Sequence, residues 1–288
     1  MCSLKHQPVP EKKVSNRRNI SAKAVTRIVF VALILDLLAF TLILPLFPRM
    51  IEYYLVQELS HPSILSEILK FLNSLKPSSL QHEKWDTVLL GGVVGSLFSL
   101  LQCVASPIIG SLSDRGGRRR TLLLTMFGNI LSCSLWLFAS NFYIFLASRI
   151  VGGLSEGNVQ LSIAIISDIT TSDTRSRGLA MVGIAFAISF TIGPALGAYF
   201  AHFQADSLPT PFACSALIAL GLLIIETLFI AYALPETMPK SQEIKQQTAV
   251  SESQTLELEK LGWIHFGHLL FFSGLEFSLT AYSLIIIY

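Results

Sequence analysis

The stretch Gly110-Ser-Leu-Ser-Asp114-Arg115-Gly116-Gly117-Arg118-Arg119-Arg120 decides the fold of this chain. Apolar runs flank it on both sides, at 89–109 and 121–139, and each has the length of a membrane-spanning helix, about 20 residues. At a rise of about 1.5 Å per residue, such a helix crosses a hydrocarbon layer about 30 Å thick. The charged stretch is too short to fold alone. It is therefore predicted to be a tight turn at the membrane surface, and its four arginines place it on the cytosolic side.

Other interpretations of this turn explain its composition less well. Arginine- and glycine-rich runs bind RNA or act as nuclear signals, but the flanking spans hold this run at the bilayer, so no nucleic-acid partner is expected. A role limited to fixing topology requires neither glycine nor an acidic residue. Gly116 and Gly117 supply the backbone freedom for a tight reversal, and Asp114 gives the arginines a specific partner.

The composition is that of an integral membrane protein. The chain is 52% hydrophobic and 14% charged, with a mean hydropathy of +0.59, whereas soluble domains carry about 25% charged residues. Seven spans are predicted, at 26–46, 89–109, 121–139, 142–166, 178–200, 212–234 and 263–287. The four cysteines form no disulfide framework and read as small buried hydrophobes. No catalytic residue, metal site or cofactor is predicted.

Lysine and arginine counts give the orientation. With the N-terminus inside, the cytosolic segments carry 16 of the 21 basic residues, while four lie in one outer loop and Arg149 lies within a span. This bias favours a cytosolic N-terminus. The chain then divides into a basic cytosolic tail (1–25), six spans (26–235) with an outer loop at 49–86, a cytosolic linker (236–262) and a seventh span (263–288). Pro45 and Pro48 are expected to end the first span.

Four charged residues inside the predicted spans form the candidate solute and proton site: Asp36, Arg149, Glu156 and Glu276. A charged residue at the centre of a membrane helix costs about 2.5–3.5 kcal/mol on insertion scales, so these groups need a water-filled cavity or each other. Arg149 and Glu156 are spaced for one helical stripe with Gly152 and Gly153. A structural Arg149–Glu156 pair stays open as the simpler interpretation, and Glu226 in the sixth span has no assigned role.

Several motifs resemble those of the major facilitator superfamily. The turn fills the pattern Gly-x-x-x-Asp-Arg-x-Gly-Arg-Arg of its loop between helices 2 and 3, with Gly110, Asp114, Arg115, Gly117, Arg118 and Arg119. The fifth span carries an antiporter-type Gly-Pro-x-x-Gly motif, at Gly193, Pro194 and Gly197, with Ser189 at a position where the motif has glycine. Asp36 followed by Pro45-x-x-Pro48 is similar to the first helix of drug:proton antiporters in that superfamily.

The resemblance implies an α-helical transporter working by alternating access, in which helices 1, 4 and 7 line the cavity. It implies transport of organic anions or tetracycline-like drugs, with proton-coupled antiport. A carboxyl group removed from water binds a proton more readily, so Asp36 or Glu276 is expected to carry protons. Arg149 can hold a carboxylate solute through two hydrogen bonds. The turn is expected to act in gating.

The resemblance covers the N-terminal half of the superfamily fold and its seventh helix. The glycine faces of the second span (Gly91, Gly92 and Gly95) and of the fifth (Gly193 and Gly197) are then expected to pack against the second half. The alternative function is a non-transporting half that regulates or assembles with a full-length transporter, and a second transporter chain is the corresponding partner. A seven-helix receptor is disfavoured by the cytosolic N-terminus. The expected location is the plasma membrane, with an endomembrane as the alternative.

Overall fold

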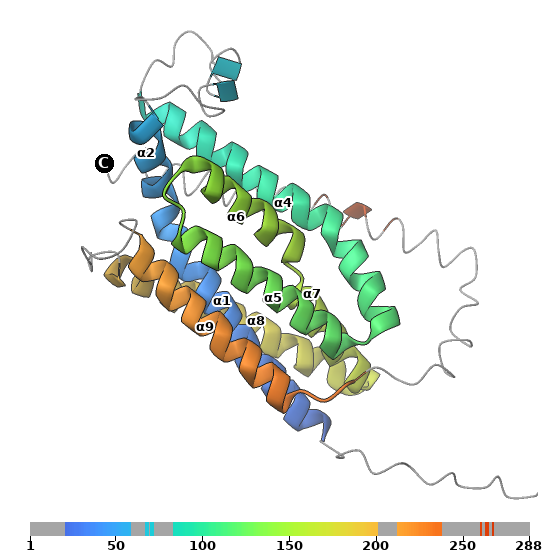
Figure 1. Cartoon of the computed structure of the whole chain (residues 1–288). Helices are drawn as coiled ribbons and strands as arrows, with labels where there is room; N and C mark the ends of the chain where they lie inside the picture. The colour runs from blue at the N-terminus through green and yellow to red at the C-terminus, as the bar shows by residue number, and fades with distance from the viewer. Residues whose placement is uncertain are drawn as a thin grey trace, which may run out of the picture.

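The chain folds into a bundle of helices (Figure 1). The computed structural model describes residues 21–58, 83–200 and 212–237, with further positions at 67–68, 70–71, 260, 263–264 and 267. The helices are α1 (Ala22–Ile43), η1 (Leu44–Leu46), α2 (Phe47–Glu58), α4 (Glu83–Gly116), α5 (Arg118–Leu137), α6 (Phe142–Ser155), α7 (Asn158–Ile169), α8 (Ser172–Phe200) and α9 (Ala213–Ala233).

Six helical segments in the described ranges are long and apolar enough to cross a membrane. They coincide with the first six predicted spans, so the predicted all-α membrane fold is confirmed. The seventh predicted span, the linker and the N-terminal tail lie largely or wholly outside the described residues. So does most of the outer loop between α2 and α4.

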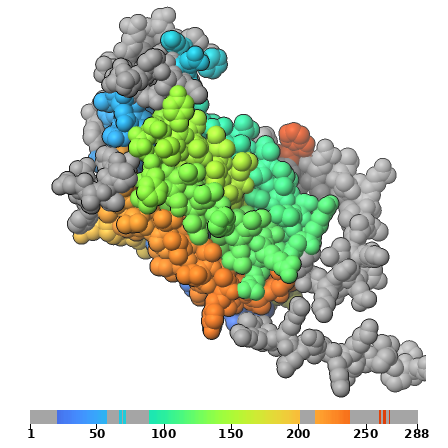
Figure 2. All heavy atoms as spheres, viewed as in Figure 1, coloured from blue at the N-terminus to red at the C-terminus, as the bar shows by residue number. Residues whose placement is uncertain are grey.

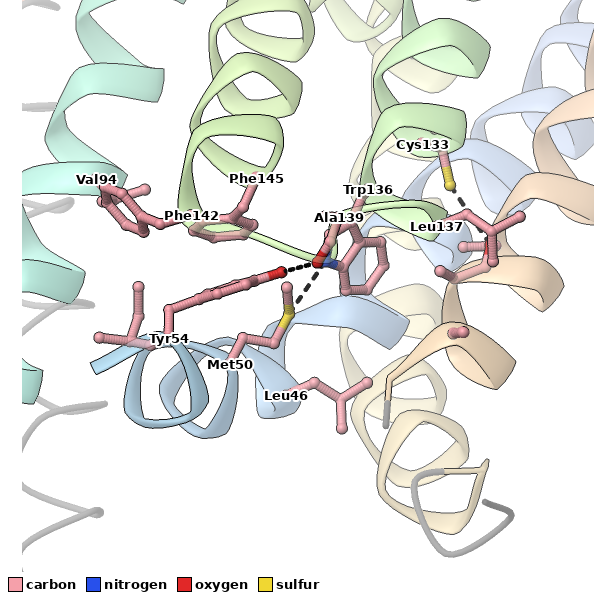
Figure 3. Packing of buried hydrophobic residues seen from close by; sticks show 14 of the residues in the cluster. Leu46, Met50, Tyr54, Val94, Cys133, Trp136, Leu137, Ala139, Phe142 and Phe145 are labelled. Atoms are coloured by element: carbon pink, nitrogen blue, oxygen red, sulfur yellow. Dashed lines mark hydrogen bonds between the residues drawn. The ribbon is translucent and has the colours of Figure 1, made fainter. Parts of the chain in front are cut away.

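Helix α1 ends at Ile43, beside Pro45, as predicted, but helical structure then resumes, which the sequence analysis did not predict. Pro45 lies in the short turn η1, and the chain then continues as α2. Burial explains the second helix, because Met50, Ile51 and Tyr54 are each at most 1% exposed. The Tyr54 hydroxyl donates to the Ala139 carbonyl at 2.5 Å, and the indole N–H of Trp136 points to the sulfur of Met50 at 3.2 Å (Figure 3). The predicted loop at 49–86 therefore begins with a helix that closes one end of the bundle.

The turn between α4 and α5 is tighter than its sequence suggested. Helix α4 extends to Gly116 and α5 begins at Arg118, so Gly117 alone leaves the helical conformation. Its φ is +101°, a value that a residue with a Cβ adopts only at a cost. Charged residues predicted to lie in a loop instead continue the two helices.

The fifth-span glycines pack against α1, not against a second half of the transporter. A Cβ added at Gly193 would collide with the Thr41 side chain, and one at Gly197 would collide with the backbone carbonyl of Leu42. The Thr41 hydroxyl donates to the Ser189 carbonyl at 3.0 Å, and the Ser189 hydroxyl points to the Ile34 carbonyl at 3.2 Å. The expectation of an unfilled groove in this span was therefore wrong. At Gly92 in α4, by contrast, an added Cβ would meet open space.

Two apolar clusters form the core, one toward each end of the bundle. The first includes Trp136, Phe145 and Leu223, and the second includes Leu33, Met126 and Ile230. Polar residues lie near the boundary between the clusters on three packed helices: Asp36 on α1, Asn129 on α5 and Glu226 on α9. Helix α9 lies beside α5 (Figure 2), and its outward side chains Ile225, Leu228 and Tyr232 are more than half exposed. Its apolar outer side suits lipid, whereas Glu226 faces inward.

Candidate functional site

Asp36 is held inside the bundle by one amide. Its side chain is 5% exposed, and its Oδ1 accepts a hydrogen bond from the Nδ2 of Asn158 at 2.9 Å. The Oδ1 of Asn158 in turn accepts from the Thr125 hydroxyl at 2.9 Å. Three helices, α1, α7 and α5, thus fix this carboxyl group, as the position of Asp36 inside an apolar span required.

The fourth predicted span is two helices. Helix α6 ends at Ser155 and α7 begins at Asn158, because Glu156 and Gly157 leave the helical conformation. The predicted stripe from Arg149 to Glu156 on one unbroken helix was therefore wrong at its last residue. The break matters for the site, since broken membrane helices occur where backbone lines a cavity or is buried in protein. It presents Glu156 and Asn158 from the ends of two helices.

Glu156 and Arg149 do not neutralise each other. Among the described residues, no ion pair joins them; Glu156 Oε2 accepts instead from the Nδ2 of Asn129 at 3.2 Å. The Arg149 guanidinium lies over Trp136 and Phe145, at 5.8 and 5.5 Å from the ring centroids. Its Nε is buried without a hydrogen-bond partner in the described part of the chain. The simpler interpretation of a structural Arg149–Glu156 pair does not hold in this structure.

These groups border one cavity of about 60 Å³. Its polar lining includes Asp36, Asn129, Arg149 and Glu156, and its apolar lining includes Phe40 and Phe98. This volume holds a few water molecules, whereas pockets for drug-sized ligands are about 300–1,000 Å³. The structure therefore shows a small cavity, which must widen to admit a drug-sized solute.

Glu226 does not line the cavity, but it is linked to the site electrostatically, although the sequence analysis assigned it no role. It is 1% exposed, and its Oε2 has no hydrogen-bond partner among the described residues. Its carboxyl group interacts electrostatically with Asp36 and Glu156. We call Asp36, Glu156 and Glu226 the acidic cluster. The signal was present in the sequence, since Glu226 is the single charged residue between 212 and 234, but the facing helix could not be identified from it.

The remaining predicted residues lie elsewhere. Glu276 is outside the described residues. Gly193 and Gly197 face α1, as described above, with Pro194 inside α8. Within the described ranges, no three His, Cys, Asp or Glu side chains are grouped so that they could hold a metal ion, and Cys103, Cys133 and Cys214 are free thiols.

The turn between α4 and α5 forms a second charged site. Arg118 pairs with Asp114 at 2.6 Å and with Asp168 at 2.8 Å, and it donates to the Ser113 hydroxyl. Its backbone N–H donates to Glu236 Oε1 at 2.9 Å, and Arg119 donates to the Ala231 carbonyl. Asp114 is thus the partner of an arginine, as predicted. The contacts of Asp168 and Glu236 tie the ends of α7 and α9 to the turn.

A multi-helix membrane bundle with a buried, charged cavity is the architecture of a membrane transporter. The chain belongs to the Major Facilitator Superfamily, whose sequence profile matches residues 29–288. Members of this family are transporters rather than enzymes.

The curated relatives include proteins named for the same superfamily and tetracycline resistance proteins. Mouse major facilitator superfamily domain-containing protein 10 is 36% identical over 91% of this chain, and the human protein of the same name is 34% identical over 96%. The matched part is 61% of the length of each relative, so this chain spans about six tenths of them. A class E tetracycline resistance protein of Escherichia coli is 29% identical over 54% of this chain and 38% of its own length.

Solved structures agree with this assignment. The crystal structure described as the human organic anion transporter MFSD10 (TETRAN) superposes with a TM-score of 0.75 at 33% identity, covering 90% of this chain and 64% of that one. A D-xylose–proton symporter superposes with a TM-score of 0.57 at 14% identity, over 87% of this chain and 54% of that one. The second match supports the fold alone.

Proposed function

We propose that this chain provides the N-terminal half of a secondary transporter that moves small organic anions across a membrane, coupled to protons. The observation that carries the proposal is Arg149, a cavity-lining cation between Trp136 and Phe145 that pairs with no carboxylate of the described residues. An unpaired buried guanidinium is costly unless a ligand binds it. A solute carboxylate or sulfonate supplies the missing charge and hydrogen bonds.

The relatives support the chemical class of the solute. One related structure is described as an organic anion transporter, and other relatives confer tetracycline resistance. An organic anion of moderate size with an apolar body suits a cavity whose walls include Phe40, Phe98 and Trp136. Binding then widens the cavity, and alternating access exposes it to either side.

Asp36 and Glu156 supply the proton chemistry of this proposal. Both line the cavity beside Arg149, and in the described part of the chain each is held by an amide side chain, Asn158 or Asn129. Carboxyl groups inside a membrane protein often bind and release protons in transport. The sequence resemblance implies antiport, but the sign of the coupling depends on the charge of the acidic cluster when the anion binds.

Membrane orientation and gating complete the proposal. The lysine and arginine bias supports a cytosolic N-terminus and a cytosolic turn between α4 and α5. Arg118 and Asp168 link that turn to α7, so the turn can respond when the broken helix moves. The plasma membrane is the proposed location, and an endomembrane is the alternative.

The test compares Arg149→Ala with Arg149→Lys in the chain reconstituted into liposomes. The probe is Lucifer yellow, a sulfonated dye whose charge stays constant over the working pH range. Loss of the guanidinium should weaken dye binding about 10- to 100-fold, because charge-assisted hydrogen bonds contribute about 1.5–3 kcal/mol. Lysine keeps the charge but not the planar fork, so it should retain part of the affinity. Equal binding by wild type and both variants would contradict the proposal.

A second candidate function is a non-transporting half that assembles with another transporter chain. It is favoured by the open space beside Gly92 on α4, where an added Cβ would meet nothing within 4 Å. Gly92→Leu should then weaken copurification with a full-length relative. Gly183→Leu on α8, where an added Cβ also meets open space, is the matched control.

A further inference from the structure

Glu226 is the most deeply buried member of the acidic cluster, and no hydrogen bond compensates its Oε2 atom within the described residues. An ionised carboxylate in that position would lose hydration that no hydrogen bond to its Oε2 atom replaces among the described residues, which is unfavourable. A protonated carboxyl group escapes most of this cost.

The charges around Glu226 also favour its protonated form over its ionised form. Helix α9 packs mainly on α1 and α5, with a small contact to α8. Glu226 interacts electrostatically with Asp36 of α1 and with Glu156 at the break between α6 and α7, and both of these residues are acids. From α5, Arg119 reaches α9, where it donates to the Ala231 carbonyl, five residues after Glu226.

The other titratable groups on these helices lie away from Glu226. On α8 the charged residues Asp173, Arg175 and Arg177 are exposed in its first two turns, and on α1 Lys23 and Arg27 are exposed near its start. The Cys133 thiol of α5 points to the Ala216 carbonyl, ten residues before Glu226. No cation of α1, α5 or α8 therefore pairs with Glu226 among the described residues, and Arg149 of α6 lies on the cavity wall with Asp36 and Glu156.

The same acids oppose the proposed solute. Asp36 and Glu156 share the cavity wall with Arg149, so an anion that approaches the guanidinium also approaches the acidic cluster. Each ionised carboxylate repels the anion strongly in a site with little water. The anion binds well only when the cluster carries protons.

Resting on the proposed function, we infer that Glu226 stores a proton in the acidic cluster, and that this proton is needed for an organic anion to bind at Arg149. The stored proton and the anion then occupy the protein together. The coupling between proton and anion binding therefore has the opposite sign to that in antiport, in which the solute displaces the proton.

The first measurement detects the proton without any transported solute. Infrared spectroscopy of the whole reconstituted chain at about neutral pH should show the carbonyl band of a protonated carboxylic acid. That band should be absent in Glu226→Gln. Thr227→Val is the matched control, since it changes the adjacent residue of α9, whose hydroxyl bonds only within its own helix. A wild-type spectrum identical to that of Glu226→Gln in this region would overturn the inference.

The second measurement follows Lucifer yellow binding against pH. In wild type, affinity should fall about tenfold or more toward alkaline pH as Glu226 ionises. Glu226→Gln, and Glu226→Leu as a variant that removes polarity altogether, should lose clearly less affinity toward alkaline pH than wild type, with the remaining loss due to Asp36 and Glu156. The same alkaline loss in both variants would overturn the inference.

The two measurements separate this inference from the function on which it rests. A chain that binds no dye at any pH contradicts the proposed anion site. The infrared band still decides whether Glu226 holds a proton, because it requires no ligand.

Discussion

The turn between α4 and α5 and the acidic cluster both contain several charged residues, but they differ in how these residues are paired. In the turn, Arg118 has two carboxylate partners, a hydroxyl partner and a backbone contact to Glu236. In the cluster, Glu226 and the neighbouring Arg149 keep buried atoms without partners among the described residues. Satisfied charges hold elements together, whereas charges left unpaired inside a protein require a ligand or a proton. The turn is therefore a structural joint, and the cluster is the chemical site.

The largest effect on stability is expected at Gly117. Its φ of +101° and the Glu236 carboxylate beside it leave no room for a side chain. Gly117→Val should lower the free energy of unfolding by at least about 2 kcal/mol, through backbone strain and loss of the Glu236 contact. Thermal unfolding in detergent measures this. Gly116→Ala is the control, because an added Cβ there meets open space on a helix, and it should be neutral or slightly stabilising.

Removal of the Arg118 side chain should have the second-largest effect on stability. Its side chain is 14% exposed and joins Asp114 and Asp168, so Arg118→Ala should cost about 1.5–3 kcal/mol of unfolding free energy. The exposed Arg115 in the same turn provides the control, and Arg115→Ala should stay within about 0.5 kcal/mol of wild type. Equal losses from the two variants would show that the joint depends on net charge and not on the contacts of Arg118.

Asp36→Asn should behave differently from the substitutions in the turn: it should change the pH dependence of binding and have little effect on stability. The amide oxygen can still accept from Asn158, and a buried charge is removed, so the unfolding free energy should change by less than about 1 kcal/mol. The pH dependence of Lucifer yellow binding should nevertheless become shallower, because one titrating group is lost. An unchanged pH profile would remove Asp36 from the proton site.

The sequence predicted the spans well because length and hydropathy determine them. It also located Asp36, Arg149 and Glu156, since any charge in an apolar span is conspicuous. It missed the break at Glu156–Gly157, because the residues on both sides are as apolar as those of a continuous helix. It also missed α2: the two prolines signal a helix end, and only the burial of Met50, Ile51 and Tyr54 against α5 and α6 explains why helical structure resumes.

The partners of residues were harder to predict than their positions. Glu226 was visible in the sequence, but its role depends on which side of α9 meets α1. Gly193 and Gly197 were correctly seen as a close-packing face, yet the helix that fills it, α1, is far away in sequence. Interhelical pairing is a property of the tertiary fold, and neither periodicity nor composition contains it.

Asp114→Asn should have the smallest effect on stability and on dye binding. It can be compared directly with Asp36→Asn, because the chemical change is the same. The Asp114–Arg118 pair is short, at 2.6 Å, but the Asp114 side chain is 61% exposed. Exposed ion pairs contribute about 0.2–1 kcal/mol, and Arg118 keeps Asp168 when Asp114 is neutralised. The loss of unfolding free energy should therefore stay below about 1 kcal/mol and shrink further in high salt, where exposed charges are screened. The pH profile of dye binding should match wild type, since water reaches Asp114 and no acid of the cluster lies in the turn.

A double-mutant cycle with Asp168→Asn measures how far the two carboxylates substitute for each other. A shifted pH profile in Asp114→Asn would show that the turn takes part in proton binding, and the division between structural joint and chemical site would fail.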